Sequence, residues 1–247
     1  MLRLIVDLVP RDPSYGLALE EAVLESARSE RIDTIRFWVN DRSVIIGRSQ
    51  SAEAEANLIL LQRKHIPLLR RLSGGGTVYH YPGNLNISVF LTSASYQQDI
   101  SDTYISFGRA LVRGLSLLDV RAKADRNAIL LSEKKIAGAA QVRGKHALLY
   151  HTTFLVSPPL IPFETLLLAM QKDYYTSLVA SRPLPMTSLS QVLSGITVAD
   201  LVEPFGESLA RLVGQTLQEE RYSSRELNRA RILHHEKYGS DRWNLSR

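Results

Sequence analysis

"RRLSGGGTVYHYPGNLNISV", residues 70–89, places three consecutive glycines between an arginine pair and two strand-like runs. Because glycine has no Cβ, Gly74, Gly75 and Gly76 can adopt positive φ and let a ligand approach the main chain. Their N–H groups can then form a concave site for a carboxylate or phosphate, and the arginines suit bidentate contact with phosphate. The stretch matches neither a P-loop nor a dinucleotide-binding fingerprint. Taken alone, it is equally consistent with a flexible turn between two strands.

The composition is that of a globular protein. With 247 residues, 45% of them hydrophobic, the chain is long enough for one sizeable core. A net charge of +5 suits an anionic substrate or an acidic partner protein, but it is too small to indicate nucleic-acid binding. The absence of cysteine excludes disulfides, thiolate metal ligands and cysteine nucleophiles. The first apolar run ends at Pro10 and is too short for a signal peptide or a membrane span, so we expect a cytoplasmic protein.

Hydrophobic periodicity predicts strands and helices that interleave without a regular βαβ repeat. We therefore expect an α+β (mixed α/β) fold in a single domain over residues 1–247, with 219–247 forming a basic helical C-terminal segment. Strands are expected at 3–9, 34–39, 43–47, 77–81, 84–91, 127–131 and 147–156, with a further short one ending at residue 71. Helices are expected at 12–27, 52–65, 99–118, 162–171, 197–220 and 223–237.

Two further stretches carry candidate site residues. "KKIAGAAQ", residues 134–141, follows a lysine pair with small residues that can lie against a ligand. A lysine ammonium can neutralise a carboxylate or phosphate as charge develops on it, although a solvent-exposed loop is the simpler interpretation of this stretch. "LLYHTTFLV", residues 148–156, places His151 in an otherwise apolar strand, where a hydrogen-bonded structural histidine is the usual explanation.

The three stretches together resemble the lipoate–protein ligase family, within the biotin and lipoate ligase and lipoyl/octanoyl transferase superfamily. The family's "RRxSGGGxVYHDxGN", "KISGSAQ" and "HHGTLL" read here as "RRLSGGGTVYHYPGN", "KIAGAAQ" and "YHTTFLV". Upstream, "LALEEAVL" and "VIIGRSQ" are similar to the family's first helix and the element that borders its pocket. Near the end, "EKYGSDRWN" resembles the segment that closes the large domain. The resemblance implies a class II-synthetase-like catalytic domain with a mixed sheet flanked by helices.

The resemblance also implies roles for individual residues. Lys135 corresponds to the catalytic lysine beside the reacting carboxylate, and Asn127 to a residue that faces the phosphates and a magnesium ion. No metal ligand is assigned beyond this neighbourhood. The residues implied to bind the acyl group and the adenylate are Arg71, Ser73, Gly74, Gly75, Gly76, Thr77, Tyr79, His80, Asn84, Gly138 and His151.

Five positions depart from the family pattern. Ala128 replaces an acidic residue in the magnesium neighbourhood, and Tyr81 replaces an acidic residue after the Tyr-His pair. Thr152 replaces a glycine beside His151, and Ala137 and Ala139 replace serines near the catalytic lysine. These changes remove two carboxylates, one of them from the magnesium neighbourhood, and two hydroxyls beside the catalytic lysine.

The missing cysteine selects among the chemistries of the superfamily. The resemblance implies that octanoyl-transferring members hold the acyl group on a cysteine thiolate, a covalent route closed to this chain. We therefore expect an ATP- and Mg²⁺-dependent ligase that attaches lipoate through lipoyl-AMP to a lysine of a lipoyl carrier domain, of the 2-oxoacid dehydrogenase or glycine cleavage type. No nucleic-acid or membrane partner is expected. The alternatives are a non-catalytic lipoate- or acyl-adenylate-binding paralogue, or a lipoyl/octanoyl transferase that works without a cysteine nucleophile.

A separate accessory subunit is also expected. Single-chain members of the family continue into a small accessory domain after the segment that resembles residues 236–244, and this chain ends at Arg247. The hypothesis is that a small protein supplies that domain and docks on residues 219–247. Aromatic residues are enriched at protein interfaces, so Tyr238 and Trp243 are expected to be exposed there.

Overall fold

The computed structural model describes residues 1–93 and 99–246. Its strands are β1 (Leu2–Arg11), β2 (Thr34–Asn40), β3 (Ser43–Ile46), β4 (Leu68–Arg70), β5 (Val78–His80), β6 (Asn84–Thr92), β7 (Lys123–Asp125), β8 (Ala128–Leu131), β9 (Lys134–Arg143), β10 (Ala147–Leu155) and β11 (Leu217–Glu219). Its α-helices are α1 (Pro13–Ser29), α2 (Ala52–Glu55), α3 (Leu58–Arg63), α4 (Ile100–Ser116), α5 (Phe163–Leu166), α6 (Val202–Val213), α7 (Ser224–Leu233) and α8 (Asp241–Asn244). Short 3₁₀ turns are η1 (Leu168–Met170), η2 (Leu189–Gln191) and η3 (Ala199–Leu201), and η4 (His234–Tyr238) is a π-helical turn.

The described strands form two sheets. The large sheet has the order β11-β1-β2-β6-β10-β9-β8-β7, and the small one has the order β4-β3-β5. β1 runs parallel to both of its neighbours, and the other pairs of the large sheet are antiparallel. The mixed α/β architecture expected from the sequence is therefore confirmed.

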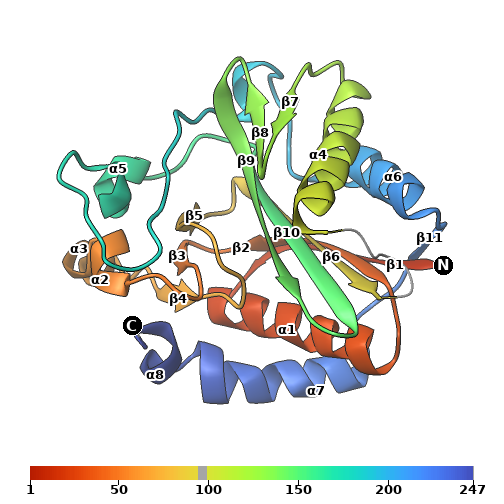
Figure 1. Cartoon of the computed structure of the whole chain (residues 1–247), viewed down its shortest axis with the longest axis horizontal. Coiled ribbons are helices and arrows are strands. Elements are labelled where there is room, and N and C mark those ends of the chain that lie inside the picture. Colours follow the sequence, from red (N-terminus) through yellow and green to blue (C-terminus); the bar gives the residue numbers. More distant parts are fainter. Residues whose placement is uncertain (94–98, 247) are drawn as a thin grey trace.

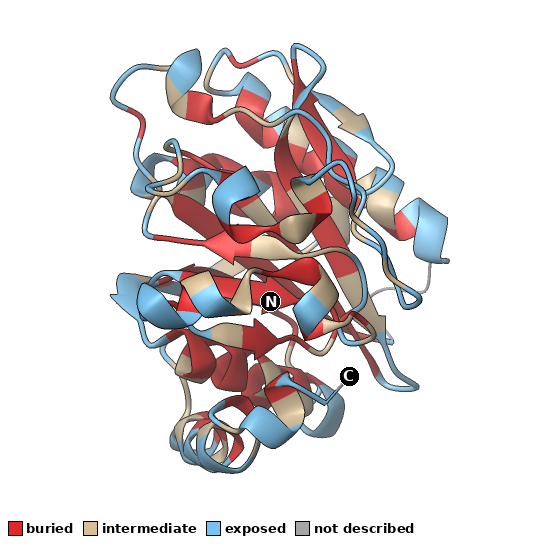
Figure 2. Ribbon diagram, turned by 90° about the vertical axis from the view of Figure 1, so that its left-hand side faces the viewer, coloured by how far each residue is buried: buried red, intermediate tan, exposed pale blue. Residues whose placement is uncertain are grey.

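Helices cover both faces of the large sheet. α1 and α7 lie side by side on one face, and α4 and α6 lie on the other (Figure 1). The central strands β2 and β6 are consequently buried along their whole length, whereas the helices expose their outer faces (Figure 2). Phe37, Ile87 and Phe205 belong to the core under α4 and α6, and Leu19, Trp38 and Ala230 to the core under α1 and α7.

Local signals in the sequence explain where the main helices begin and end. Asp12 caps α1 by accepting a hydrogen bond from Tyr15 N, and a proline occupies the first turn, where no N–H is needed. Ser223 and Glu226 form a reciprocal capping box that starts α7. α6 ends at Gly214, which has φ +67°, a conformation that strongly favours glycine.

Four expected elements differ in the structure. Residues 134–143 form strand β9 rather than an exposed loop, because β8 and β10 both pair with this small-residue stretch. The helix expected at 52–65 is two short helices, interrupted where Ala56 forms an isolated β-bridge. The helix expected at 162–171 consists only of α5 and the 3₁₀ turn η1. The helix expected at 197–220 is limited to η3 and α6, and the last residues of that range form strand β11. In the three helical cases, pairing with another segment replaced helical hydrogen bonds: Ala56 pairs with Leu167, and β11 pairs with β1.

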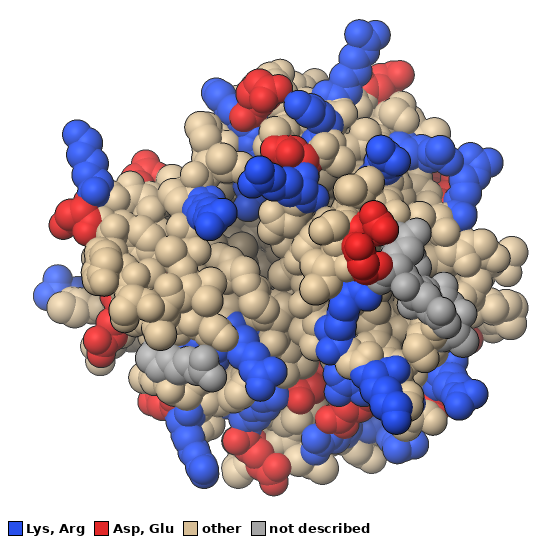
Figure 3. All heavy atoms as spheres, in the orientation of Figure 1, with Lys and Arg blue, Asp and Glu red and all other residues tan. Residues whose placement is uncertain are grey.

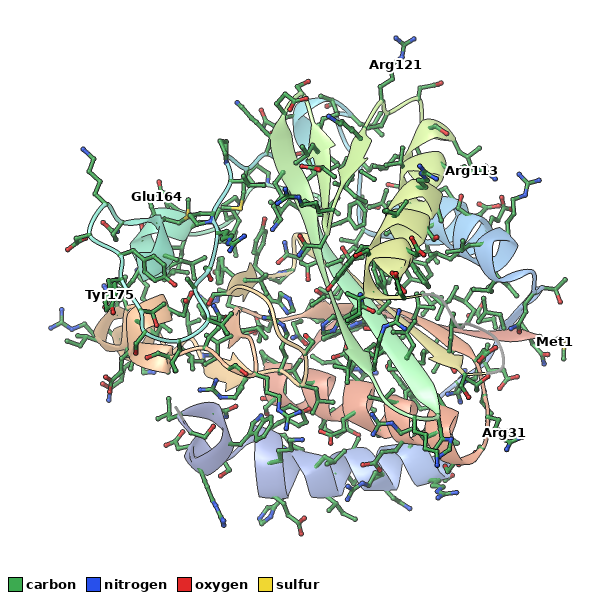
Figure 4. The ribbon with its side chains drawn as sticks, viewed as in Figure 1. Met1, Arg31, Arg113, Arg121, Glu164 and Tyr175 are labelled. Carbon is green, nitrogen blue, oxygen red and sulfur yellow. The ribbon has the colours of Figure 1, made fainter. Side chains whose placement is uncertain are left out.

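Arginine side chains extend into solvent from the outer side of these layers. Arg113, near the end of α4, and Arg121 point away from the sheet into solvent (Figure 4). Among the described residues, no helix combines the length and the apolar character that a membrane crossing requires.

Candidate active site

A cavity of about 530 Å³ opens between the glycine-rich stretch, strands β9 and β10, and residues 180–186. This face is hollowed near its centre, and Lys and Arg side chains stand on the rim of the hollow (Figure 3). The predicted site residues that line the cavity are Arg71, Gly75, Gly76, Thr77, Tyr79, His80, Asn127, Lys135, Gly138 and His151. Three predicted residues, Ser73, Gly74 and Asn84, do not border it. The structure therefore brings together residues from strands β5, β9 and β10 and from the loops that follow β4 and β7.

The three consecutive glycines, Gly74, Gly75 and Gly76, differ in backbone conformation and in the space around them. Gly75 has φ +87°, which a side chain would strain, and a Cβ on Gly47 would lie 2.3 Å from Gly75 O. Gly76 lies against Ser181, whose Oγ would be 3.0 Å from an added Cβ, whereas an added Cβ on Gly74 would meet nothing within 4 Å. Within the described residues, the N–H groups of all three glycines donate no hydrogen bond. These N–H groups remain available to an anion, as the sequence predicts.

Arg71 holds the glycine-rich loop from within. Its Nε donates to Ser73 Oγ at 2.9 Å, and its other guanidinium nitrogens donate to Ile45 O at 3.1 Å, Gly74 O at 2.6 Å and Gly76 O at 2.7 Å. Burial lowers the pKa of Arg71 to about 10, so the side chain remains protonated at neutral pH. Its charge therefore reaches the cavity from a guanidinium whose donors are already used, which differs from the bidentate phosphate contact expected from the sequence.

A buried hydrogen-bond chain runs behind the loop. His151 Nδ1 lies 2.9 Å from Glu20 Oε1, and its Nε2 lies 2.7 Å from Ser73 Oγ. Glu20 also accepts from Ser88 Oγ at 2.6 Å, and Ser88 in turn accepts from Trp38 Nε1 at 2.9 Å. Burial alone would raise the pKa of Glu20, but the charge of His151 and the hydrogen bonds from His151 and Ser88 leave that pKa below its usual value. A carboxylate accepts only, so it fixes the proton of the imidazole on Nδ1.

Sequence reasoning missed Glu20. The available signal is its position on α1, where it falls three residues after Leu17 on the apolar face rather than on the solvent face. A charged residue on the buried stripe of a helix is rarely left without a partner. That pattern marks Glu20 as a member of an internal network.

His80 is a neutral histidine. It is buried, its Nδ1 lies 3.2 Å from Asn40 Nδ2, and its Nε2 lies 3.1 Å from Thr153 Oγ1. Because the Asn40 amide nitrogen is a donor, His80 Nδ1 accepts, and Nε2 carries the proton that Thr153 receives. Burial, reinforced by the charge of Arg71, lowers the pKa of His80 to about 3. His80 therefore offers a fixed, uncharged wall to the cavity.

Lys135 is a cavity cation without a protein counter-ion among the described residues. Its main chain is fixed from both sides, with Lys135 N donating to Pro185 O at 2.7 Å and Thr187 N donating to Lys135 O at 3.0 Å. Among the described residues, none accepts a hydrogen bond from its Nζ or forms an ion pair with it. Burial, and after it the charge of Arg71, lower the pKa of Lys135. The neighbouring Lys134 is exposed and does not line the cavity.

The mouth of the cavity carries Asn127 on the β7–β8 hairpin. Its Nδ2 donates to Ala139 O at 3.0 Å. This hydrogen bond orients the side-chain amide, and the Oδ1 atom takes no part in it. Asp125 lines the same wall, and it is the cross-strand partner of Ala128. No group of three or more potential metal ligands occurs among the described residues. One carboxylate and one amide oxygen fit a Mg²⁺ ion that is held mainly by phosphates, which is how Mg²⁺ usually binds.

The departures from the family pattern are accommodated locally. Thr152 lines the cavity and donates its hydroxyl to Gly138 O at 3.1 Å. Tyr81 is buried away from the cavity, where its OH donates to Ser157 O at 2.6 Å. Asn84 Oδ1 accepts from Tyr81 N at 2.9 Å, so Asn84 shapes this turn and does not border the cavity.

A second buried carboxylate, that of Glu55, forms hydrogen bonds both to Ser181 on the rim of the cavity and to Thr77 at the end of the glycine-rich loop. Glu55 is fully buried and accepts from Ser181 Oγ at 2.5 Å, from Thr77 Oγ1 at 2.8 Å and from the hydroxyl of Tyr174. Ser181 Oγ in turn accepts from Thr77 N at 2.8 Å. The sequence "AEAEA" offers no signal that separates the buried Glu55 from the exposed Glu53.

This geometry forms a cleft suited to an anionic ligand, with a neutral histidine in its wall, open main-chain N–H groups and a lysine that makes no ion pair with the described residues. Residues 12–210 match the model of the lipoyl protein ligase A/B catalytic domain. The chain is 30% identical, over 98% of its length and 96% of the relative's, to lipoate-protein ligase A subunit 1 of Thermoplasma acidophilum. The chain belongs to the lipoyl protein ligase A/B catalytic domain family.

Solved structures agree with this assignment. The fold matches a chain of a bi-partite lipoate protein ligase, studied with its E2 lipoyl domain, from Thermoplasma acidophilum, with a TM-score of 0.85 and 27% identity over 98% of this chain and 95% of that one. It also matches a crystal structure of lipoate-protein ligase A bound with ATP, with a TM-score of 0.85 and 27% identity over 98% of both chains. Several other curated relatives are longer, and this chain spans about half of their length.

Proposed function

We propose that this chain activates lipoate with ATP as lipoyl-AMP and transfers the lipoyl group to a lysine of a lipoyl carrier domain. One observation carries the proposal: the Lys135 ammonium faces a cavity in which no described side chain neutralises it, and the same cavity is lined by Gly75 and Gly76, whose main-chain N–H groups make no hydrogen bond. Both features are suited to a substrate that gains or redistributes negative charge during reaction. The family match and the ATP-bound relative support the same substrate class.

In the first half-reaction, a lipoate carboxylate oxygen attacks the α-phosphorus of ATP. The new C–O–P linkage forms as the bond between the α-phosphorus and the bridging oxygen breaks, and pyrophosphate leaves. Lys135 is placed to attract both the carboxylate and the α-phosphate, so it lowers the repulsion between two anions that must approach each other. No proton transfer is required, in agreement with the neutral His80 and with a lysine in the cavity wall that forms no ion pair with the described residues.

In the second half-reaction, the neutral amine of the carrier lysine attacks the carbonyl carbon of lipoyl-AMP. The amide bond forms, the bond from carbon to the phosphate oxygen breaks, and AMP leaves with its phosphate charge stabilised by Lys135. The amine loses a proton to the departing phosphate or to water. No covalent acyl-enzyme is needed, and the chain contains no cysteine to form one.

Magnesium belongs to the same proposal. Asp125 and Asn127 are the residues that would hold it, together with the phosphates of ATP. When bound, the ion neutralises the charge that builds up on the leaving pyrophosphate.

The proposal includes a separate small subunit. The relative that matches over nearly the full length is named a subunit, and the matching structure is described as bi-partite. A second protein would complete the enzyme in adenylation, in transfer or in both. The candidate carrier is a lipoyl domain of the E2 type, the kind named with that structure.

Mass spectrometry of a lipoyl carrier domain tests the proposal. The domain is incubated with lipoate, ATP, Mg²⁺ and this chain, with and without the candidate small subunit, and with Lys135→Ala as the matched control. A mass increase of one lipoyl group that requires ATP and Lys135 supports the ligase. Tight lipoate or lipoyl-AMP binding with no modification under any of these conditions favours the non-catalytic binding protein instead, a candidate motivated by Ala128 and Thr152.

A further inference from the structure

The C-terminal turn folds back on the strand that leads into the glycine-rich loop. α8 lies beside β4, which is the edge strand of the small sheet (Figure 1). Trp243 Nε1 donates to Arg70 O at 2.7 Å, and Asn244 Oδ1 accepts from Arg70 N at 3.0 Å. Two side chains thus supply the donor and the acceptor that a neighbouring strand would give to this edge. Tyr238 is only 1% exposed and Trp243 is half-buried, so the expectation that both C-terminal aromatics are exposed is wrong for Tyr238. The docking of a small subunit on residues 219–247 stays a prediction.

The turn is itself held on α1. Tyr238 OH donates to Glu21 Oε2 at 2.7 Å, and Lys237 Nζ donates to the same oxygen at 2.8 Å. Asn244 Nδ2 donates to Tyr238 O at 2.8 Å, and the Lys237 ammonium lies 4.2 Å from the centre of the Trp243 ring. A rigid support on α1 therefore carries the two side chains that contact β4.

From β4 the contacts continue to the cavity. The buried Arg70 guanidinium donates to Gly47 O at 3.1 Å and Gln50 O at 2.7 Å, which closes the turn after β3. Gln50 Oε1 accepts from Gly47 N at 2.7 Å and lies 3.1 Å from Thr77 Oγ1, and its Nε2 donates to Ser181 Oγ at 3.0 Å. Gly47 lies directly against the carbonyl of the strained Gly75. An unbroken set of contacts thus joins the last helix to two cavity walls.

We propose that Trp243 and Asn244 are positioning residues for the glycine-rich loop and, through Gln50, for the rim at Ser181. They touch no substrate. They hold the main chain of Arg70, whose guanidinium sets the turn against which Gly75 rests. The proposal rests on the proposed function for its ligands, lipoate and ATP, but its structural part concerns this chain alone.

Trp243→Phe is the sharpest variant, because it keeps an aromatic ring for Lys237 and removes only the N–H that Arg70 O accepts. Arg242→Ala, an exposed change in the same helix, is the matched control. Leu209→Ala, a cavity-forming change in the core on the other side of the large sheet, controls for lowered stability alone. Asn244→Ala tests the second contact to the same strand.

Hydrogen exchange measured by mass spectrometry on the unliganded protein tests the structural part. We expect faster exchange at the hydrogen-bonded amides of residues 45–50 and at Thr77 in Trp243→Phe and Asn244→Ala than in the two controls. Calorimetric titration with lipoate and with a non-hydrolysable ATP analogue should show dissociation constants raised by about threefold to tenfold in the same two variants, the effect of one lost buried hydrogen bond. Unchanged exchange at residues 45–50 and at Thr77, or unchanged dissociation constants in variants that only melt at lower temperature, would overturn the proposal. A wild-type chain that binds neither ligand would instead refute the proposed function, while the exchange data still decide the positioning role.

Discussion

The Lys135 side chain lies across Gly138. A Cβ at position 138 would come within 2.6 Å of Lys135 Nζ and 2.7 Å of its Cε, closer than real Cβ contacts allow. Gly138 therefore provides the space that lets a partly buried ammonium reach the cavity. The glycine after the lysine is required by this contact and not by backbone conformation, because only Gly75, Gly195 and Gly214 have positive φ among the described glycines.

Gly138→Ala should displace the ammonium while leaving the fold intact, because the clashing atoms belong to the end of a flexible side chain. A displacement of about 1 Å at a catalytic group costs about a hundredfold in rate. We expect kcat for carrier modification to fall by that order with little change in melting temperature. Gly74→Ala, which meets nothing within 4 Å, is the control. An active Gly138→Ala enzyme would show that the Lys135 position is not critical.

Lys135→Ala should lower the rate of adenylation by about two to three decades, which corresponds to the loss of about 3–4 kcal/mol of charge stabilisation. Lys134→Ala should have little effect, because Lys134 is exposed and does not line the cavity. Lipoate-dependent exchange of pyrophosphate into ATP measures both. Equal losses of exchange rate in the two variants would show that the catalytic role assigned to Lys135 is wrong.

A comparison of Gly75→Ala with Gly74→Ala should show whether backbone conformation makes glycine necessary in the loop. An alanine at position 75 strains the backbone, whereas position 74 has room for a Cβ. Gly75 has φ +87°, so an alanine there costs about 1–2 kcal/mol of backbone strain, and its Cβ would also lie 3.2 Å from the Arg71 guanidinium. We expect Gly75→Ala to weaken lipoate binding and Gly74→Ala to leave it unchanged, as measured by calorimetric titration of the folded variants. Equal lipoate affinities of the two variants would show that the backbone geometry of the loop does not explain the three glycines.

The stability of the protein should fall on mild acidification because of His80. Its folded-state pKa of about 3 lies below the usual 6.5, so between these values the unfolded chain binds a proton that the folded chain does not. The free energy of unfolding should therefore be fully retained above pH 6.5 and decrease by about 2 kcal/mol between pH 6.5 and pH 5. The lowered pKa of Glu20 acts below this range, since its usual value is 4.5.

Denaturant titrations at several pH values check the prediction. His80→Gln should flatten the slope between pH 6.5 and 5, and the exposed His235→Gln should keep it. A slope that survives in His80→Gln would show that another group binds the proton.

The site residues that belong to sequence motifs could be predicted. The buried residues that support those motifs through contacts between distant parts of the sequence could not. The glycine-rich loop, His80, Lys135 and His151 follow from local patterns, and the structure gathers them around one cavity. Glu55 was not predictable, because its partner Ser181 lies far away in the sequence and "AEAEA" does not distinguish its two glutamates.

The C-terminal segment shows how composition can mislead. Its high charge suggested an exposed surface, yet Leu227, Ala230 and Leu233 form a helical stripe that α7 buries against α1. Tyr238 and Trp243 continue that buried side. Spacing of the few apolar residues was the better guide than the overall charge of the segment.

The central claim, that Lys135 and the glycine-rich loop activate lipoate with ATP, is tested most directly by one measurement. Purified chain, with the candidate small subunit present, is incubated with lipoate, Mg²⁺, ATP and labelled pyrophosphate, and the label in ATP is followed. The account predicts lipoate-dependent incorporation that falls by about two to three decades in Lys135→Ala. Absence of lipoate-dependent exchange in the wild-type chain, or exchange that Lys135→Ala leaves unchanged, would contradict it.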